Sequence, residues 1–293
     1  MLFTGTGVAI VTPFCNDRTV DFDALRRIVN HCIAGGVDYI VVLGTTGETV
    51  TLSDCEKKKA VKCVVDEVAG RVQVVVGHGG NNTADIVEKV KTSDFTGISG
   101  ILSVAPYYNK PTQAGLIEHF KTVAAASPVP VIIYNVPART GVNMTAETTL
   151  TLAHEIDNIV SVKEASGMMP QIMQIIKNRP ENFSVVSGDD VMSLPLIAVG
   201  GQGVISVAAN AFPREVATII RNSLSNNFAE AQAAHYSMLE IFEALFIDGN
   251  PSGIKAALNI LGLSQNVLRL PLVPATESTY KKIERLIELK MKN

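Results

Sequence analysis

Charged residues are scarce in this sequence, making up 18% of its 293 residues, whereas hydrophobic residues make up 47%. Disordered chains and coiled coils carry many more charges, and the sequence has no low-complexity tract, so both classes are excluded. The sequence also has no excess of positive charge, because it contains 25 basic and 28 acidic residues and its net charge is −3. We therefore expect no nucleic-acid partner. A small-molecule enzyme is the natural expectation.

Cysteine and targeting signals are also poorly represented. The few cysteines form no CxxC pair and are too few for a disulfide scaffold, which favours a reducing cytoplasm; they are Cys15, Cys32, Cys55 and Cys63. No basic residue precedes Arg18, so we predict no secretory signal. The longest uncharged run, 191–213, is interrupted by Pro195 and the glycines of GGQG. It predicts a buried helix, a turn and a strand, and we expect no membrane association.

Short β-branched runs recur every 25 to 30 residues, with helix-period segments between them. The runs are apolar on both faces, as expected for parallel strands buried between a packed interior and a helix layer. Eight such units predict a (β/α)₈ TIM barrel of the α/β class. The strands are predicted at 7–14, 39–44, 72–77, 100–106, 129–135, 159–165, 183–188 and 203–208.

Helix-start signals lie where a barrel requires them. Asp21 opens the first helix, Ser53 with Glu56 forms a capping box at the second, and Thr145 precedes the fifth. After residue 225 only helical patterns remain, at 228–246, 251–262 and 276–290. We therefore predict a catalytic barrel domain at 1–225 and a C-terminal helical domain at 226–293. This extension serves either packing or an oligomer interface.

One strand, 159–165, carries a cation. Barrel enzymes place catalytic groups at the carboxyl ends of strands, and the two-residue period turns Lys163 into the barrel together with Ser161. Burial lowers the pKa of a lysine, and a neutral amine is the nucleophile that forms a Schiff base with a carbonyl substrate. The alternative is a structural lysine paired with a buried carboxylate, such as Glu164 or Asp189.

Other polar residues follow neighbouring strands. Tyr134 ends the adjacent fifth strand and can act as an acid/base for Schiff-base chemistry, with Thr46 and another tyrosine as relay; the alternative is an ordinary core tyrosine. The GTTGET segment either binds a carboxylate through its backbone, supplies a hydroxyl pair to a relay, or is a plain turn. The planar guanidinium group of Arg139 is suited to bind a substrate carboxylate through two hydrogen bonds. The alternative is that Arg139 is an ordinary surface residue.

Several mechanisms have no support in the sequence. Of the five histidines only His78 follows a strand, so we predict no metal site. There is neither a GxGxxG helix start nor a P-loop motif, so no dinucleotide or other cofactor is predicted. The seventh strand ends in Asp189 and Asp190, which disfavour a phosphorylated substrate; Asp190 can also cap the next helix.

Five strings in this order resemble the dihydrodipicolinate synthase family of the N-acetylneuraminate lyase superfamily, the class I aldolases. They are GTTGE at 44–48, PYYNKPTQ at 106–113, YNVPARTG at 134–141, SVKEAS at 161–166 and VSGDD at 186–190. The resemblance covers nearly the whole chain. It implies condensation of pyruvate with L-aspartate 4-semialdehyde to hydroxytetrahydrodipicolinate, in the diaminopimelate route to lysine.

The resemblance also implies roles for individual residues. Lys163 would form the imine with pyruvate, and the relay would consist of Tyr134, Thr46 and Tyr108. The last of these reaches across a dimer interface in the family, which is typically a homotetramer. The substrate-binding set would be Thr45 and Thr46 for the pyruvate carboxylate, Gly188 and Ile205 through backbone groups, and Arg139 for the carboxylate of the semialdehyde.

Two positions distinguish this chain within the superfamily. Relatives that act on sialic acid or other sugar acids tend to lack an arginine matching Arg139. His78 replaces a small hydroxyl residue and is expected to affect only the mouth of the site.

Some relatives are inhibited by lysine bound near the residues that match Thr49, Asp54, Lys57, Asn81, Asp85 and Tyr107. Where those relatives often have a histidine, this chain has Lys57, and a cation there should repel the ammonium groups of lysine. We expect weak or absent lysine inhibition.

Two alternatives to the synthase stay open at this point. One is a pyruvate-dependent aldolase or lyase for N-acetylneuraminate or a keto-deoxy sugar acid. The other is a barrel that senses a keto acid without turnover.

Overall fold

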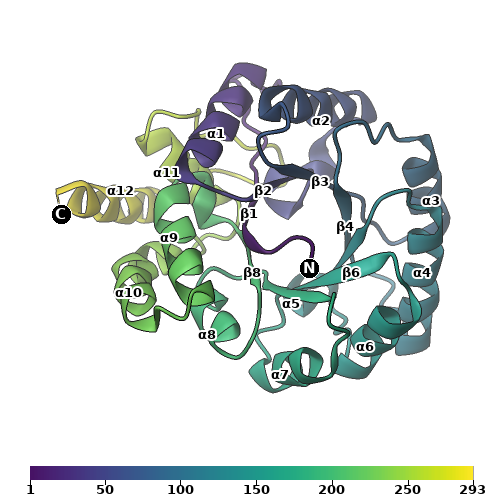
Figure 1. The fold of residues 1–293 in the computed structure, drawn as a ribbon. Coiled ribbons are helices and arrows are strands. Elements are labelled where there is room, and N and C mark those ends of the chain that lie inside the picture. Colours follow the sequence, from purple (N-terminus) through teal and green to yellow (C-terminus); the bar gives the residue numbers. More distant parts are fainter. Residues whose placement is uncertain (293) are drawn as a thin grey trace.

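The structure, a computed structural model, describes residues 1–292. Eight parallel strands pair in sequence order and the last pairs with the first, so the sheet closes into a barrel (Figure 1). The predicted TIM-barrel fold is confirmed. The strands are β1 (Gly5–Ala9), β2 (Tyr39–Val42), β3 (Gln73–Gly77), β4 (Gly100–Val104), β5 (Val131–Asn135), β6 (Ile159–Glu164), β7 (Ser184–Ser187) and β8 (Gly203–Ser206).

Seven of these strands begin and end within two residues of the prediction, and the first does not. It was predicted at 7–14, but β1 ends at Ala9. Pro13 has no N–H to donate to a ladder, and the chain forms an isolated antiparallel bridge between Phe14 and Val20 instead. The residues that follow therefore turn back on themselves between Phe14 and Val20 and do not extend the strand.

Helices surround the barrel, and their starts follow the predicted signals. Asp21 caps the first helix by accepting from the N–H of Ala24, Ser53 and Glu56 form a complete capping box, and Thr145 accepts from the N–H of Thr148. The helices of the barrel are α1 (Phe22–Gly35), α2 (Asp54–Val68), α3 (Thr83–Thr92), α4 (Gln113–Ala126), α5 (Pro137–Thr140), α6 (Ala146–Glu155), α7 (Met169–Asn178), α8 (Ser193–Ala198) and α9 (Pro213–Leu224). Short 3₁₀ turns, η1 (Thr45–Gly47), η2 (Thr49–Thr51) and η3 (Ala208–Asn210), follow β2 and β8.

The core has an outer and an inner part. Outside the sheet, strand residues such as Ile40 and Val204 pack against the helices. Inside the barrel a separate cluster fills the centre, and it includes Tyr39, Ile132 and Tyr134. Burial of each aliphatic side chain stabilises the folded state by about 1.5–3 kcal/mol relative to its exposure to water. The strands are therefore rigid supports for the residues at their carboxyl ends.

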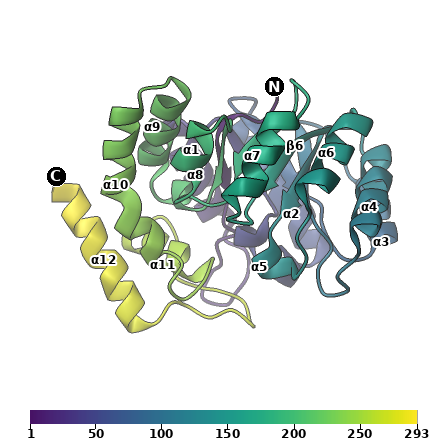
Figure 2. The same ribbon diagram turned by 90° about the horizontal axis from the view of Figure 1, so that it is seen from below.

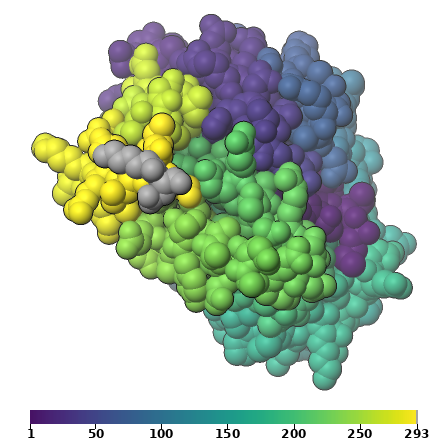
Figure 3. Space-filling model, turned by 60° about the vertical axis from the view of Figure 1, so that its left-hand side comes forward, coloured from purple at the N-terminus to yellow at the C-terminus, as the bar shows by residue number. Residues whose placement is uncertain are grey.

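Three helices follow the barrel: α10 (Phe228–Ala244), α11 (Ser252–Ile260) and α12 (Glu277–Lys292). They lie on one side of the barrel, where α10 packs on α9 and α12 packs on both α10 and α11 (Figures 1 and 3). The chain between α11 and α12 extends along the end of the barrel that also carries α5 (Figure 2). We call residues 249–276 the return segment, which includes α11.

The long uncharged run at 191–213 folds as predicted into α8, a glycine turn and β8. Across residues 1–292, the structure contains no helix with both the length and the apolar character needed to cross a membrane.

Candidate active site

A cavity of about 330 Å³ opens at the carboxyl ends of the strands. Four successive strands and the loops after them supply lining residues, among them Gly44, Thr45, Gly77, Val104, Tyr107 and Tyr134. Further lining residues come from α5 and from the return segment: Arg139, Thr140, Asn250, Pro271 and Leu272. This is the end of the barrel where TIM-barrel enzymes carry their active sites.

Lys163 lies on β6 beside Tyr134 on β5, and the two residues are direct partners in the strand pairing. The side chain of Lys163 is 5% exposed, and its Nζ lies 4.3 Å from the centroid of the Tyr134 ring. Tyr134 lines the cavity, and Lys163 lies behind it as a buried neighbour that does not itself line the cavity. Gly188 leaves space for it, because a Cβ there would lie 3.0 Å from Cε of Lys163.

The structure does not support the alternative of a structural lysine. Lys163 takes part in no ion pair within residues 1–292. Glu164 lies on the other face of β6, where its carboxylate accepts hydrogen bonds from the amides of Asn135 and Gln171. The amine is therefore buried without a direct anionic partner.

Burial lowers the pKa of Lys163 from its ordinary value of 10.5 to about 8, because the ammonium form loses its hydration. The positive charge of Arg139 acts in the same direction, and the carboxylate of Asp190 opposes both. An amine with this pKa is present in its neutral, nucleophilic form at neutral pH to an extent that an exposed lysine is not.

Burial has the opposite effect on the neighbouring phenol. It raises the pKa of Tyr134 to about 12, while Arg139 and a hydrogen bond with the side chain of Thr45 act to lower it. Tyr134 therefore remains protonated at neutral pH and can donate its proton to a developing oxyanion.

The two threonines of the GTTGET segment differ in their surroundings. Thr45 begins η1, is exposed to the cavity and interacts with Tyr134. Thr46 is buried, and its Oγ1 accepts a hydrogen bond of 3.0 Å from Nδ2 of Asn250. Thr45 and Tyr134 both line the cavity, whereas Thr46, which was predicted for the relay, does not.

Arg139 lies at the cavity on α5, a single helical turn that begins with Pro137 and is closed by Gly141 at a φ of 73°. Its guanidinium donates a hydrogen bond of 3.4 Å to the backbone carbonyl of Asn250. The remaining N–H groups of the guanidinium fork are available to an anionic ligand.

The other predicted site residues lie at or outside the edge of this arrangement. Ile205 belongs to the inner cluster of the barrel together with Tyr134. Tyr108 is 88% exposed, has a φ of 73° and does not line the cavity within this chain. The structure therefore brings together Lys163, Tyr134 and Arg139 with the two threonines, but not Tyr108.

One predicted role was wrong. Asp190 does not cap α8, which begins after Met192 without a side-chain cap. Its buried carboxylate instead accepts hydrogen bonds from the hydroxyl of Ser206 and from the backbone N–H groups of Val207 and Ala208. The N–H groups of Val207 and Ala208 lie beyond the end of β8, and the carboxylate of Asp190 accepts their hydrogen bonds. Asp190 thus connects the loop after β7 to the loop after β8.

His78 lies in a second cavity of about 580 Å³ between α2 and α3, which is also lined by Lys57 and Lys89. Burial lowers the pKa of His78 to about 4, so the ring is neutral. Within residues 1–292 no cluster of three or more histidine, cysteine, aspartate or glutamate side chains is placed to hold a metal ion.

The contribution of the C-terminal extension to this cavity was not predicted. Asn250, Pro271 and Leu272 line it, although the sequence suggested only packing or an oligomer interface for this region. The only local signal was a polar residue between Gly249 and Pro251, which by itself indicates a turn.

Comparison with known proteins gives a consistent result. A model of the "Dihydrodipicolinate synthetase family" matches residues 2–290. A protein of Parabacteroides distasonis named 4-hydroxy-tetrahydrodipicolinate synthase is 52% identical over 283 residues, which cover 97% of this chain and 95% of the relative. Among solved structures, dihydrodipicolinate synthase from Aquifex aeolicus is 42% identical with a TM-score of 0.95, covering 99% of this chain and 98% of that chain. The enzyme from Thermotoga maritima is 38% identical with a TM-score of 0.97, covering 99% of each chain.

Proposed function

The chain belongs to the dihydrodipicolinate synthetase family, and from this premise we propose that it condenses pyruvate with L-aspartate 4-semialdehyde. The product is 4-hydroxy-tetrahydrodipicolinate, as in the names of its relatives, on the diaminopimelate route to lysine. The enzyme is of the lyase type. The observation that carries the proposal is the amine of Lys163, which is buried beside the cavity-lining Tyr134 and has a lowered pKa.

The first half of the reaction activates pyruvate. The neutral amine of Lys163 adds to C2 of pyruvate, and loss of water gives a protonated imine. The imine withdraws electrons from C3, so a proton leaves C3 and an enamine forms. No cofactor is required, because the imine of Lys163 itself serves as the electron sink.

The second half joins the two substrates. C3 of the enamine attacks the aldehyde carbon of the semialdehyde, and the new alkoxide takes a proton from the hydroxyl of Tyr134. The amino group of the semialdehyde then adds to C2 and displaces the amine of Lys163. This closes the ring, releases the product and returns the lysine to its starting form, with one water lost overall.

We assign the proton relay to Tyr134 and Thr45, in place of Thr46. The position of both Thr45 and Tyr134 at the cavity supports this assignment, and Thr46 keeps the role of binding the carboxylate of pyruvate that the family resemblance implies. Tyr108 completes the relay by reaching into the site of a second subunit. Its exposure and its position outside the cavity of its own chain are consistent with this role.

Arg139 binds the carboxylate of the semialdehyde. Its guanidinium lies at the cavity and offers two parallel N–H groups, which match the two oxygens of a carboxylate. Gly188 and Ile205 complete the substrate-binding set through their backbone groups.

Three further proposals concern the whole molecule. The chain forms a homotetramer built as a dimer of dimers, since Tyr108 requires at least one neighbour. It acts in the cytoplasm. Its catalytic barrel domain spans 1–225, and the helical domain spans 226–293.

Turnover of pyruvate with aspartate semialdehyde, compared with cleavage of N-acetylneuraminate and keto-deoxy sugar acids, tests the proposal. We expect condensation with the semialdehyde and no cleavage of the sugar acids. Faster cleavage of a sugar acid would assign the chain to another aldehyde. Binding of pyruvate without any turnover would make it a sensor.

The variant Arg139→Ala should lower kcat/KM for the semialdehyde by roughly 100-fold or more, because a bidentate charged contact is lost. The KM for pyruvate should change little. Unchanged use of the semialdehyde would contradict the role of Arg139.

A further inference from the structure

The return segment contacts the catalytic loop at one polar side chain. Asn250 is 9% exposed and lines the active-site cavity. Its Nδ2 donates a hydrogen bond of 3.0 Å to Oγ1 of Thr46, a contact between residues 204 positions apart in the sequence. A residue of the C-terminal extension therefore reaches a proposed pyruvate-binding group directly.

This hydrogen bond determines where the Thr46 hydroxyl can direct its proton. A threonine hydroxyl has one O–H donor and two lone pairs. Because Asn250 donates to the oxygen, the O–H must point away from the amide. Among the hydrogen bonds of residues 1–292, the Thr46 hydroxyl donates to no protein acceptor, so its proton is not taken up by another protein group.

Asn250 also holds the residue assigned to the second substrate. Its backbone carbonyl accepts a hydrogen bond from the guanidinium of Arg139, at 3.4 Å. One N–H of the guanidinium is thereby fixed and the rest of the fork is oriented. A single residue thus contacts one binding group for each substrate, through its side chain in one case and its backbone in the other.

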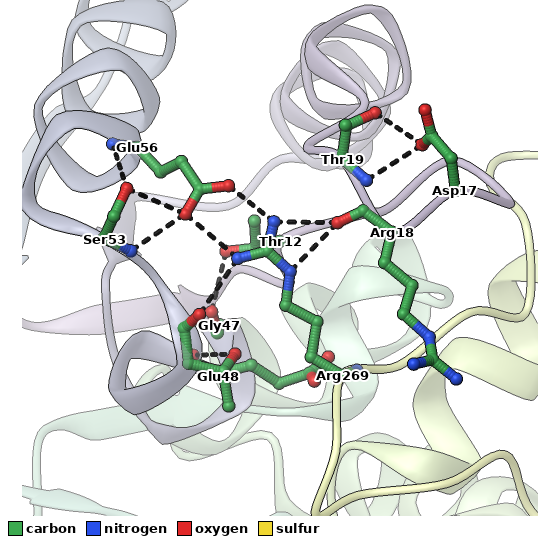
Figure 4. Close-up of polar contacts among 10 residues, drawn as sticks. Thr12, Asp17, Arg18, Thr19, Gly47, Glu48, Ser53, Glu56 and Arg269 are labelled. Carbon is green, nitrogen blue, oxygen red and sulfur yellow. Dashed lines mark hydrogen bonds and ion pairs between the residues drawn. The ribbon is translucent and has the colours of Figure 1, made fainter.

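A buried charged cluster holds the loop and the return segment together. Glu48, two residues after Thr46, pairs with Lys255 of α11, and both side chains are fully buried. The second carboxylate oxygen of Glu48 accepts the backbone N–H of Arg269 at 3.0 Å. The guanidinium of Arg269 binds the carboxylate of Glu56 at the start of α2 and the carbonyl of Arg18 (Figure 4).

These contacts fix the distance between Asn250 and Thr46. Glu48 adopts a φ of 49° at the end of η1, and its carboxylate contacts Lys255 and Arg269 of the return segment. Lys255 lies five residues after Asn250, close to the point where the segment begins. The loop and the segment are therefore anchored to each other beside the hydrogen bond between Asn250 and Thr46.

We propose that Asn250 is a positioning residue of the reaction, which orients the hydroxyl of Thr46 towards pyruvate and the guanidinium of Arg139 towards the second substrate. The inference rests on the proposed function. It gives the C-terminal extension a part in substrate recognition.

A double-mutant cycle tests this role, with kcat and KM measured for both substrates. Asn250→Ala should lower kcat/KM for pyruvate about 10-fold or more in the wild-type background. In the Thr46→Val background the same change should alter this constant by less than about twofold, because the oriented hydroxyl is already gone. Multiplicative effects of the two substitutions would overturn the proposal.

Asn250→Asp provides a variant of nearly the same shape. Its carboxylate cannot donate to Thr46 and would accept the threonine proton instead, so the KM for pyruvate should rise as much as in Asn250→Ala. Retention of the wild-type KM would contradict the proposed orientation of the hydroxyl.

Tyr280→Phe is the matched control for general loosening of the extension. It removes the hydrogen bond of 2.9 Å from the Tyr280 hydroxyl to Asn259, far from the catalytic loop in sequence. Both kinetic constants should stay within about twofold of wild type. An equal loss in Tyr280→Phe and Asn250→Ala would show that Asn250 has only a structural role. Absence of turnover in the wild-type enzyme would instead refute the proposed function.

Discussion

The buried pair between Glu48 and Lys255 allows a quantitative prediction for Glu48→Gln. In the wild-type protein one carboxylate oxygen faces Nζ of Lys255 and the other accepts the backbone N–H of Arg269. A glutamine presents one oxygen and one NH₂ group at these positions. Whichever way the amide is turned, its NH₂ group meets a donor, and the ammonium of Lys255 loses its counter-ion.

The size of the effect follows from the burial. Removing one partner of a fully buried ion pair costs about 3–5 kcal/mol, because the other charge remains stranded. The entropy of unfolding is about 2.1 cal/mol/K per residue, or roughly 0.6 kcal/mol/K for this chain. We therefore expect Glu48→Gln to lower Tm by about 5–8 °C.

Thermal unfolding followed by circular dichroism measures this shift, and two further variants make it specific. The exposed pair between Glu277 and Lys281 supplies the matched control, and Glu277→Gln should change stability by less than about 1 kcal/mol. The double variant Glu48→Gln/Lys255→Met should be more stable than either single variant, because no buried charge is left unpaired. A shift of less than about 1 °C for Glu48→Gln, or additive losses in the double variant, would refute the reasoning.

Three other predictions concern the chemistry. The rate of imine formation, measured by borohydride trapping, should rise with pH and level off above the Lys163 pKa of about 8, because only the neutral amine reacts. At pH 7 about one tenth of the amine is neutral. A rate that still rises at pH 10 would indicate a lysine with an unperturbed pKa. The variants Tyr108→Phe and Lys163→Ala should each be nearly inactive, but a mixture of the two should regain activity, because a hybrid dimer contains one intact site. Turnover measures the recovered activity, and sedimentation shows that dimers are present. No recovery in mixed dimers would place Tyr108 outside the neighbour's site. Free lysine at micromolar concentration should leave the rate unchanged, since the cation of Lys57 repels it, and strong inhibition would contradict that expectation.

The barrel could be predicted from the sequence because each strand and helix carries its own local signal. The β-branched runs, the capping box of Ser53 and Glu56, and the cap at Asp21 require only neighbouring residues. Lys163 was identifiable for the same reason: it is a single cation in a set of nearly uncharged strands. The barrel then brings Tyr134 beside it through strand order alone.

The contacts that the sequence could not predict join distant parts of the chain. Asn250 meets Thr46 and Lys255 meets Glu48 only because the return segment folds back over the barrel mouth, and helical periodicity carries no information about that path. Thr45 and Thr46 are neighbours in one 3₁₀ turn, and the sequence could not predict that the first lines the cavity while the second is buried. Asp190 had a second available role that only the position of the loop after β8 revealed.

The most direct test of the account is to reduce the enzyme with borohydride in the presence of pyruvate and to locate the adduct by peptide mass spectrometry. We predict one reduced pyruvate per chain, attached at Lys163, and no adduct in Lys163→Ala. An adduct on another lysine, or full condensation activity without any adduct at Lys163, would contradict the central claim.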